Sequence, residues 1–97
     1  MSFTIENVDW ERNQSRLKAL REHVFVLEWQ LSPDSEFDER DKNAFHVLVV
    51  AENNTPIATG RLTQCGEIGR IAVKRNHRHL SVYRALFAAL IDIAKKQ

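Results

Sequence analysis

The sequence predicts an α+β domain in which helices flank an antiparallel sheet. Three β-branched runs within residues 46–73 are separated by turn sequences, which favours two consecutive hairpins. Amphipathic helical patterns lie on both sides of these runs, at about 13–29 and 81–95. The predicted order is strand, helix, turn, three strands and helix, which is typical of an α+β fold. With 97 residues the chain forms a single domain, 1–97.

The first elements are predicted from apolar spacing. Phe3 and Ile5 alternate with polar neighbours, which indicates a short opening strand. Pro33, within the turn sequence 32–35, is expected to end the helix that precedes it, at about 13–29. The acidic stretch 36–41 is expected to form a loop or helical turn. The helix from about Asn13 to Trp29 has four apolar residues at helical spacing: Leu17, Leu20, Val24 and Leu27.

The central strands have the clearest signal. His46–Glu52 is rich in valine and ends at the turn sequence 53–56, which contains two asparagines and a proline. Ile57–Gln64 continues as a strand, Cys65-Gly66 turns the chain, and Glu67–Val73 forms a third strand.

The last helix, about Ser81 to Lys95, is apolar on nearly two faces. Such a helix needs more than one packing partner. The strand 67–73 would also have an open edge, because no later strand follows it in the sequence. We therefore expect a homodimer that buries mainly the last helix. The predicted core stripe is Val82, Leu86, Ala89, Leu90 and Ile93, and Phe87 and Ile91 widen it.

Composition limits the class of protein. The hydrophobic fraction of 43%, the charged fraction of 28% and the net charge of +1 describe an ordinary globular chain. No apolar run approaches the roughly 20 residues that span a bilayer, and the first ten residues lack the features of a signal peptide. The single cysteine, Cys65, excludes an internal disulfide and suits a reducing compartment, so we expect a cytoplasmic protein.

Positive charge gathers in the second half of the chain. No acidic residue lies between Ile68 and Ile91, and the junction between the third central strand and the last helix is basic. The first N–H groups of a helix lack internal partners and carry the positive end of its dipole, which favours an anion. The junction therefore predicts an anion site, with cations at Arg70, Lys74, Arg75, Arg78 and Arg84.

The order of residues at this junction carries a family resemblance. Arg70-Ile71-Ala72-Val73, four further residues, Arg78, and then Leu86 in an apolar helix resemble the cofactor-binding segment of the GNAT superfamily, the acyl-CoA-dependent N-acyltransferases. The resemblance runs from about Leu17 to Ala94. Upstream blocks that are similar to one bacterial GNAT branch are 21–28, 36–41, 46–48 and Arg61-Leu62.

The resemblance implies acetyl-CoA as acyl donor and an amine as acceptor. The strand that ends at Ile71 and Val73 would pair with the pantetheine arm, and the loop after it would hold the pyrophosphate. Ser81 and Tyr83 stand where the family pattern has glycines, and His79 stands where many members have one, so we expect weak CoA binding. The cofactor-binding residues implied in this way are Ile71, Val73, Arg78, His79, Ser81, Val82 and Tyr83.

The resemblance also suggests catalytic groups. Glu67 is similar in position to the glutamate that acts as base in some family members, and the Val73 N–H would be the oxyanion donor. The tyrosine acid of the family comes from a later helix that these 97 residues do not contain, so 1–97 is expected to be a GNAT-like domain without the family's C-terminal strands, truncated or weakly active. The alternative is a non-catalytic GNAT-like module for binding or dimerisation.

Other sites have weaker support in the sequence. His77 and His79, with His46 and Cys65, do not have a strong ligand spacing, so we expect no metal. We expect no membrane partner, and no nucleic-acid partner because the basic patch lacks an RNA-binding or helix-turn-helix signature. Trp10 and Trp29 are expected to pack against the sheet, with a place for Trp29 in an acceptor pocket as the alternative.

Overall fold

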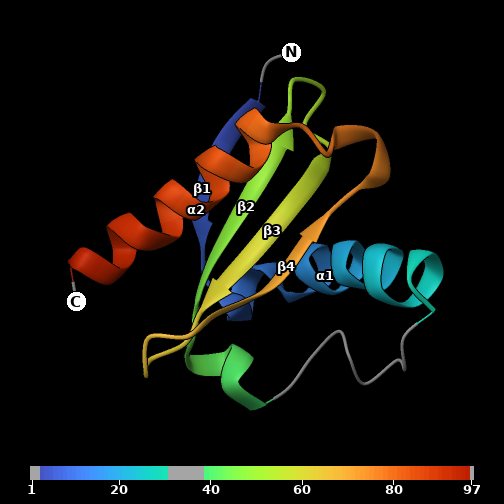
Figure 1. Ribbon diagram of the computed structural model, residues 1–97. Coiled ribbons are helices and arrows are strands. Elements are labelled where there is room, and N and C mark those ends of the chain that lie inside the picture. The colour runs from blue at the N-terminus through green and yellow to red at the C-terminus, as the bar shows by residue number, and fades with distance from the viewer. Residues whose placement is uncertain (1–2, 31–38, 97) are drawn as a thin grey trace.

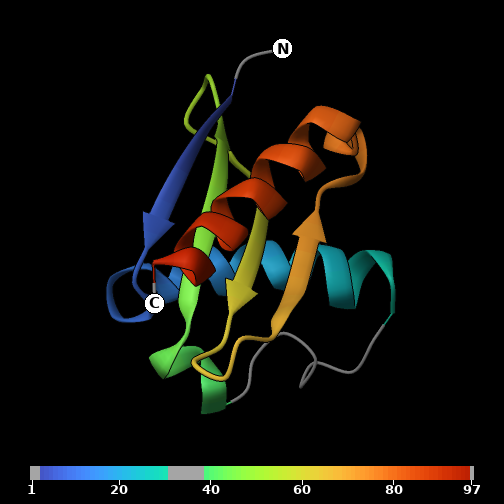
Figure 2. The ribbon, with the colours of Figure 1, turned by 60° about the vertical axis from the view of Figure 1, so that its left-hand side comes forward.

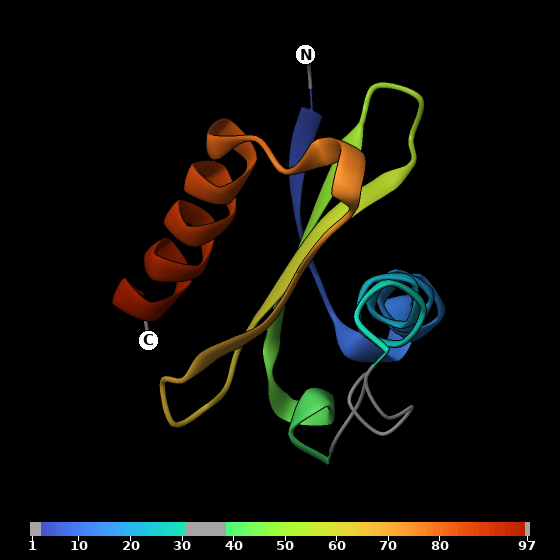
Figure 3. The same cartoon turned by 45° about the vertical axis from the view of Figure 1, so that its right-hand side comes forward.

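A computed structural model describes residues 3–30 and 39–96 and confirms the predicted α+β class. Four antiparallel strands form one sheet in the order β1-β2-β3-β4. Helix α1 covers one face of the sheet and helix α2 covers the other (Figures 1 and 3). The elements are β1 (Phe3–Val8), α1 (Trp10–Arg21), β2 (Phe45–Ala51), β3 (Pro56–Leu62), β4 (Ile68–Val73) and α2 (Leu80–Lys95).

The predicted elements are confirmed, with small shifts at their ends. The opening strand β1 pairs with β2 along its whole length, from Phe3 opposite Ala51 to Val8 opposite His46. Helix α1 begins three residues earlier than expected because Asp9 caps it: the Asp9 carboxylate accepts a hydrogen bond from the Arg12 N–H at 2.8 Å.

The segment between α1 and β2 is described in part. The helix continues from α1 as a π-helical segment, η1 (Glu22–Glu28), and a 3₁₀ helix, η3 (Glu39–Asn43), precedes β2. The break expected at 32–35 and the first part of the acidic stretch lie outside the described residues. Among the described residues, no helix is long and apolar enough to cross a membrane.

Two apolar cores lie on the two faces of the sheet. The first joins α2 to the sheet through buried residues such as Val47, Ile57 and Leu86. The second joins α1 to Leu48 and neighbouring positions and includes Trp10, whose predicted packing against the sheet is confirmed. The same prediction for Trp29 is wrong. Its side chain is 60% exposed, because it follows the last turn of η1.

Strand β4 carries a β-bulge that makes Gly60 necessary. Arg61 pairs with Gly69 and Thr59 pairs with Ala72, so Gly60 alone faces two residues of β4. Arg70, one of those two, has a left-handed backbone conformation with φ of 50°. A Cβ on Gly60 would lie 2.8 Å from Ile71 Cδ1 and 2.9 Å from a methyl group of Leu90. The bulge thus brings core side chains over the bare backbone of Gly60.

A buried ionic cluster joins α1, η3 and the sheet. The Asp41 carboxylate is fully buried and accepts hydrogen bonds from Arg21 at 2.9 Å and from Arg61 at 3.1 Å. The Asp41 carbonyl lies 2.9 Å from His46 Nε2, and Arg21 Nη2 lies 3.4 Å from His46 Nδ1. Trp10 covers the cluster, with its ring 5.7 Å from the Arg21 guanidinium.

The cluster holds His46 in its neutral form. Burial is the main cause that lowers the pKa of His46 below its ordinary value of 6.5, and the hydrogen bond to the Asp41 carbonyl opposes this effect. A neutral ring that donates from Nε2 to the carbonyl leaves Nδ1 to accept from Arg21. A protonated ring would set an N–H against the Arg21 guanidinium.

We expect Gly60→Ala to lower the free energy of unfolding by about 1–3 kcal/mol, because the added methyl group must displace the terminal methyl groups of Ile71 and Leu90. Gly69→Ala is the matched control, since a Cβ there meets nothing within 4 Å. Urea unfolding of both variants measures the difference. Equal stabilities of the two variants would contradict the close approach at the bulge.

We expect the free energy of unfolding to fall as the pH drops below about 6.5. In this window the unfolded chain takes up a proton at His46 while the folded chain, with its lowered pKa, does not. Urea unfolding at intervals between pH 7.5 and 5 measures the slope, and His46→Gln should make it shallower. An identical slope in the variant would show that His46 does not cause it.

Candidate functional site

Strand β4 forms one edge of the sheet, opposite β1, and directs part of its backbone outward (Figure 2). The Lys74 N–H donates to the Ile57 carbonyl at 2.9 Å, and Val73 pairs with Ala58. In an antiparallel ladder, neighbouring residues alternate between bonding the partner strand and facing away from it. The N–H and C=O of Val73 therefore point away from β3, toward the open edge.

A cavity of about 290 Å³ lies beside this edge. Its walls come from η1, from β4, from the loop after β4 and from the first turn of α2. Four of the seven lining residues were predicted as cofactor-binding residues, so the structure brings these four together. The lining residues are Val24, Phe25, Trp29, Ile71, Val73, Arg78 and Tyr83.

Arg78 bridges the strand and the helical segment across this cavity. Its Nε–H donates to the Val73 carbonyl at 2.9 Å. Its guanidinium carbon lies 5.7 Å from the centre of the Trp29 ring, a distance at which a cation is attracted to the aromatic face. Arg78 is half-buried as a result.

The start of α2 presents backbone donors next to Arg78. His79 is the N-cap residue, and its carbonyl accepts hydrogen bonds from Val82 at 3.0 Å and from Tyr83 at 3.3 Å. The N–H groups of Leu80 and Ser81 have no hydrogen-bond partner among the described residues. Two donors and the positive end of a helix of 16 residues therefore face outward.

The remaining predicted residues of this loop take different places. Ser81 is the second residue of α2, and no side chain caps this helix. Ser81 and His79 are exposed, whereas Val82 is fully buried in the core under α2. Tyr83 is half-buried and packs against that core, so its side chain stands between the core and the cavity.

Glu67 lies apart from this group. It immediately precedes β4, is exposed, and forms an ion pair with Arg40 at 3.0 Å. Five residues lie between it and Val73, and six steps along an extended strand correspond to at most about 20 Å. The structure therefore does not bring Glu67 into the cavity that contains Val73 and Arg78.

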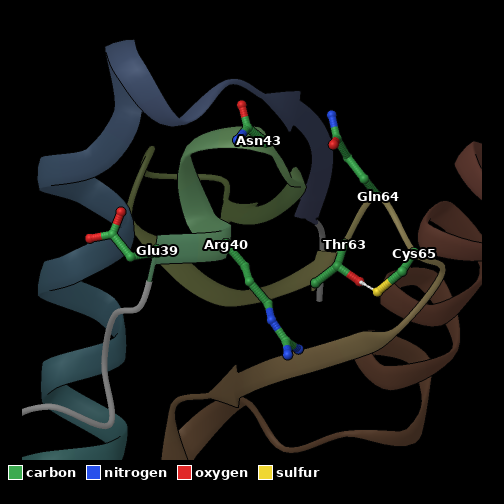
Figure 4. Close-up of a pocket in the computed structure, with 6 residues that line it drawn as sticks. All are labelled: Glu39, Arg40, Asn43, Thr63, Gln64 and Cys65. Atoms are coloured by element: carbon green, nitrogen blue, oxygen red, sulfur yellow. Dashed lines mark hydrogen bonds between the residues drawn. The ribbon is translucent and has the colours of Figure 1, made fainter.

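A second cavity, of about 330 Å³, lies beside Glu67 between η3 and the β3–β4 turn (Figure 4). All six lining side chains carry polar atoms, and Figure 4 shows Arg40 reaching down from η3 while Glu39 points away from it. Thr63 Oγ1 lies 3.2 Å from Cys65 Sγ and accepts a hydrogen bond from the Glu67 N–H at 3.0 Å. The lining residues are Glu39, Arg40, Asn43, Thr63, Gln64 and Cys65.

Sequence reasoning missed two walls of the first cavity. Val24 and Phe25 lie within the helix predicted over 13–29 and were not expected at a cavity, and Trp29 lines the same cavity. The signal was present in the apolar run 24–27, which is too wide for a single packing face. Among the described residues, no group of three or more His, Cys, Asp or Glu side chains could hold a metal ion.

Known proteins share this sequence pattern and this architecture. The profile of the Acetyltransferase (GNAT) family matches residues 7–97. YyaT of Bacillus subtilis (strain 168), an uncharacterized protein, is 28% identical over 101 residues, which cover 98% of this chain and 68% of YyaT.

Solved structures agree with the sequence match. A protein of Lactobacillus plantarum assigned as an N-acetyltransferase superposes with a TM-score of 0.82 at 27% identity, over 99% of this chain and 69% of that one. Glucosamine-6-phosphate N-acetyltransferase from Arabidopsis thaliana shares the fold, with a TM-score of 0.67 at 14% identity over 99% of this chain and 76% of that one. The profile match over residues 7–97, together with the open β4 edge beside a helix start, shows that this chain belongs to the acetyltransferase (GNAT) family.

Proposed function

We propose that this chain binds acetyl-CoA along the open edge of β4 and transfers its acetyl group to an amine. The observation that carries the proposal is the outward-facing backbone of Val73, beside a cavity of about 290 Å³ and an uncapped helix start. The amides of a pantetheine arm would pair with β4 as an added strand does. We also propose that the reaction takes place in the cytoplasm.

The cofactor's pyrophosphate would bind at the start of α2. The N–H groups of Leu80 and Ser81 and the helix dipole supply the attraction. Tyr83 and His79 occupy positions where glycines would let the backbone approach the phosphates more closely. These two residues therefore favour weak binding of CoA.

The chemistry needs a base for the acceptor ammonium and a donor for the thioester oxygen. The outward N–H of Val73 would serve as the donor, and we propose Glu67 as the base. Because about 20 Å of strand separates these two residues, Glu67 would accept the proton through a relay of waters. The polar cavity lined by Arg40 and Thr63 lies beside Glu67, at the end of β4 opposite to Val73.

A second candidate function is a GNAT-like module that binds without catalysis. The observation in its favour is the separation of Glu67 from Val73, together with the bulky Tyr83 at the cofactor site. Binding without turnover would distinguish this function from the first.

Titration calorimetry with CoA and acetyl-CoA tests the proposed function. We expect saturable binding of one cofactor per chain with a dissociation constant of about 10 µM or weaker, because the loop offers few free amides to the pyrophosphate. If neither CoA nor acetyl-CoA gives a heat of binding at high protein concentration, the chain is not a CoA-dependent enzyme.

Glu67→Gln should lower the rate of acetyl transfer about 100-fold, the usual contribution of a general base. The exposed ion pair with Arg40 contributes only about 0–1 kcal/mol to stability, so the variant should fold normally. CoA release in the presence of a panel of primary amines measures the rate. Glu39→Gln, in the same cavity but pointing away from Arg40, is the control. Equal rates in both variants would remove Glu67 from the mechanism.

We further propose that two copies associate through α2. Phe87 and Ile91 remain 38% and 45% exposed on this helix, outside the core stripe. Their burial against a second copy would contribute several kcal/mol at about 25 cal/mol per Å². We expect light scattering at micromolar concentration to give twice the mass of one chain, and Phe87→Glu with Ile91→Glu to restore the mass of one. A monomer in the unmodified chain would refute the association.

A further inference from the structure

The Arg78 side chain lies where a cofactor arm would need to bind. Its Nε–H donates a hydrogen bond to the Val73 carbonyl at 2.9 Å. That carbonyl is one of the outward groups of β4 that could pair with an amide of the pantetheine arm. Its guanidinium rests over Trp29 at 5.7 Å and so spans the cavity from β4 to the end of η1. In this arrangement Arg78 closes the edge that the proposed function requires to be open.

We propose that Arg78 is a specificity-determining residue for the thioester. It covers the β4 edge, which weakens the binding of thioesters without phosphate, and it leaves the edge when the thioester carries a phosphate or pyrophosphate. This inference rests on the proposed function. A ligand reaches the Val73 carbonyl only if Arg78 leaves it, and leaving costs the hydrogen bond and the contact with Trp29.

A phosphate beside the start of α2 gives the guanidinium a better partner. Arg78 immediately precedes the N-cap residue His79, and the outward N–H groups of Leu80 and Ser81 follow directly. A hydrogen bond between a guanidinium and a phosphate joins opposite charges, whereas the bond to the Val73 carbonyl joins a cation to a neutral acceptor. A phosphate held by the helix start therefore draws Arg78 away from β4. A thioester without phosphate provides no such charged partner for the guanidinium.

The covered state can be tested without any ligand. Trp29 emission is isolated as the difference between each protein and its Trp29→Phe counterpart. We expect acrylamide to quench Trp29 more strongly in Arg78→Ala than in the unmodified chain, because the guanidinium no longer covers the ring. Arg12→Ala, which removes an exposed arginine from α1, outside the site, should leave the quenching unchanged. Equal quenching in all three proteins would overturn the proposal.

The competition is tested with two thioesters, acetyl-CoA and S-acetylpantetheine, which share the arm and differ in the phosphates. We expect Arg78→Ala to bind acetyl-CoA about tenfold more weakly and S-acetylpantetheine about fivefold more tightly, each change being the size of one hydrogen bond. Arg12→Ala should not change the binding of either thioester. Circular dichroism confirms that each variant is folded.

The outcomes separate this inference from the proposed function. If Arg78→Ala weakens both thioesters equally, Arg78 only supports binding, and the inference is wrong while the function stands. If no thioester binds to any of the proteins, the proposed function fails, and the quenching result still decides whether Arg78 covers the edge.

Discussion

The fold depends on the buried carboxylate of Asp41. A charge without solvent is costly unless it is paired and fully hydrogen-bonded. Asp41 meets this requirement with Arg21 at the end of α1 and Arg61 in β3, so that three distant segments are held at one point. Burial lowers the pKa of Arg21 below its usual value, and the Asp41 carboxylate opposes this shift and keeps the guanidinium charged. Since η1 continues directly from Arg21, the same ion pair fixes the direction of the segment that carries Val24 and Phe25 to the cavity.

The open edge of β4 follows from a second constraint, the bulge opposite Gly60. The bulge inserts one residue into β4, changes the direction of the strand and increases its twist. Ile71 can then cover Gly60 from the helix side, while Val73 returns to regular pairing with its backbone groups facing outward. The ion cluster and the bulge act on opposite sides of β3. The ion cluster positions the η1 wall of the cavity, and the bulge positions the β4 edge that forms the facing wall.

Local patterns predicted most of this architecture, and long-range contacts account for what they missed. The valine-rich run at β2 and the turn residues after it predict strands because their signal lies within a few residues. The bulge left no such signal, since it lies opposite Gly60, where the space for a side chain is taken by Leu90, 30 residues away in the sequence. Trp29 was misplaced for the same reason: nothing in its neighbourhood in the sequence indicates that Arg78 provides its partner. The family resemblance identified Ile71, Val73, Arg78 and Tyr83 together, because their spacing is local to one strand–loop–helix junction.

The absence of glycine in the junction changes how it can hold a phosphate. A glycine-rich loop binds phosphate with its backbone N–H groups, which need no side chain and cannot turn elsewhere. In this chain Ser81 and Tyr83 stand where the family resemblance places glycines, so under the proposed function side-chain cations would supply part of the attraction. A flexible side chain, unlike a backbone amide, can take another partner when no phosphate is present. The Val73 carbonyl and the Trp29 ring are two such partners of Arg78, so under the proposed function the covering of the β4 edge follows from the use of a side-chain cation in place of backbone amides.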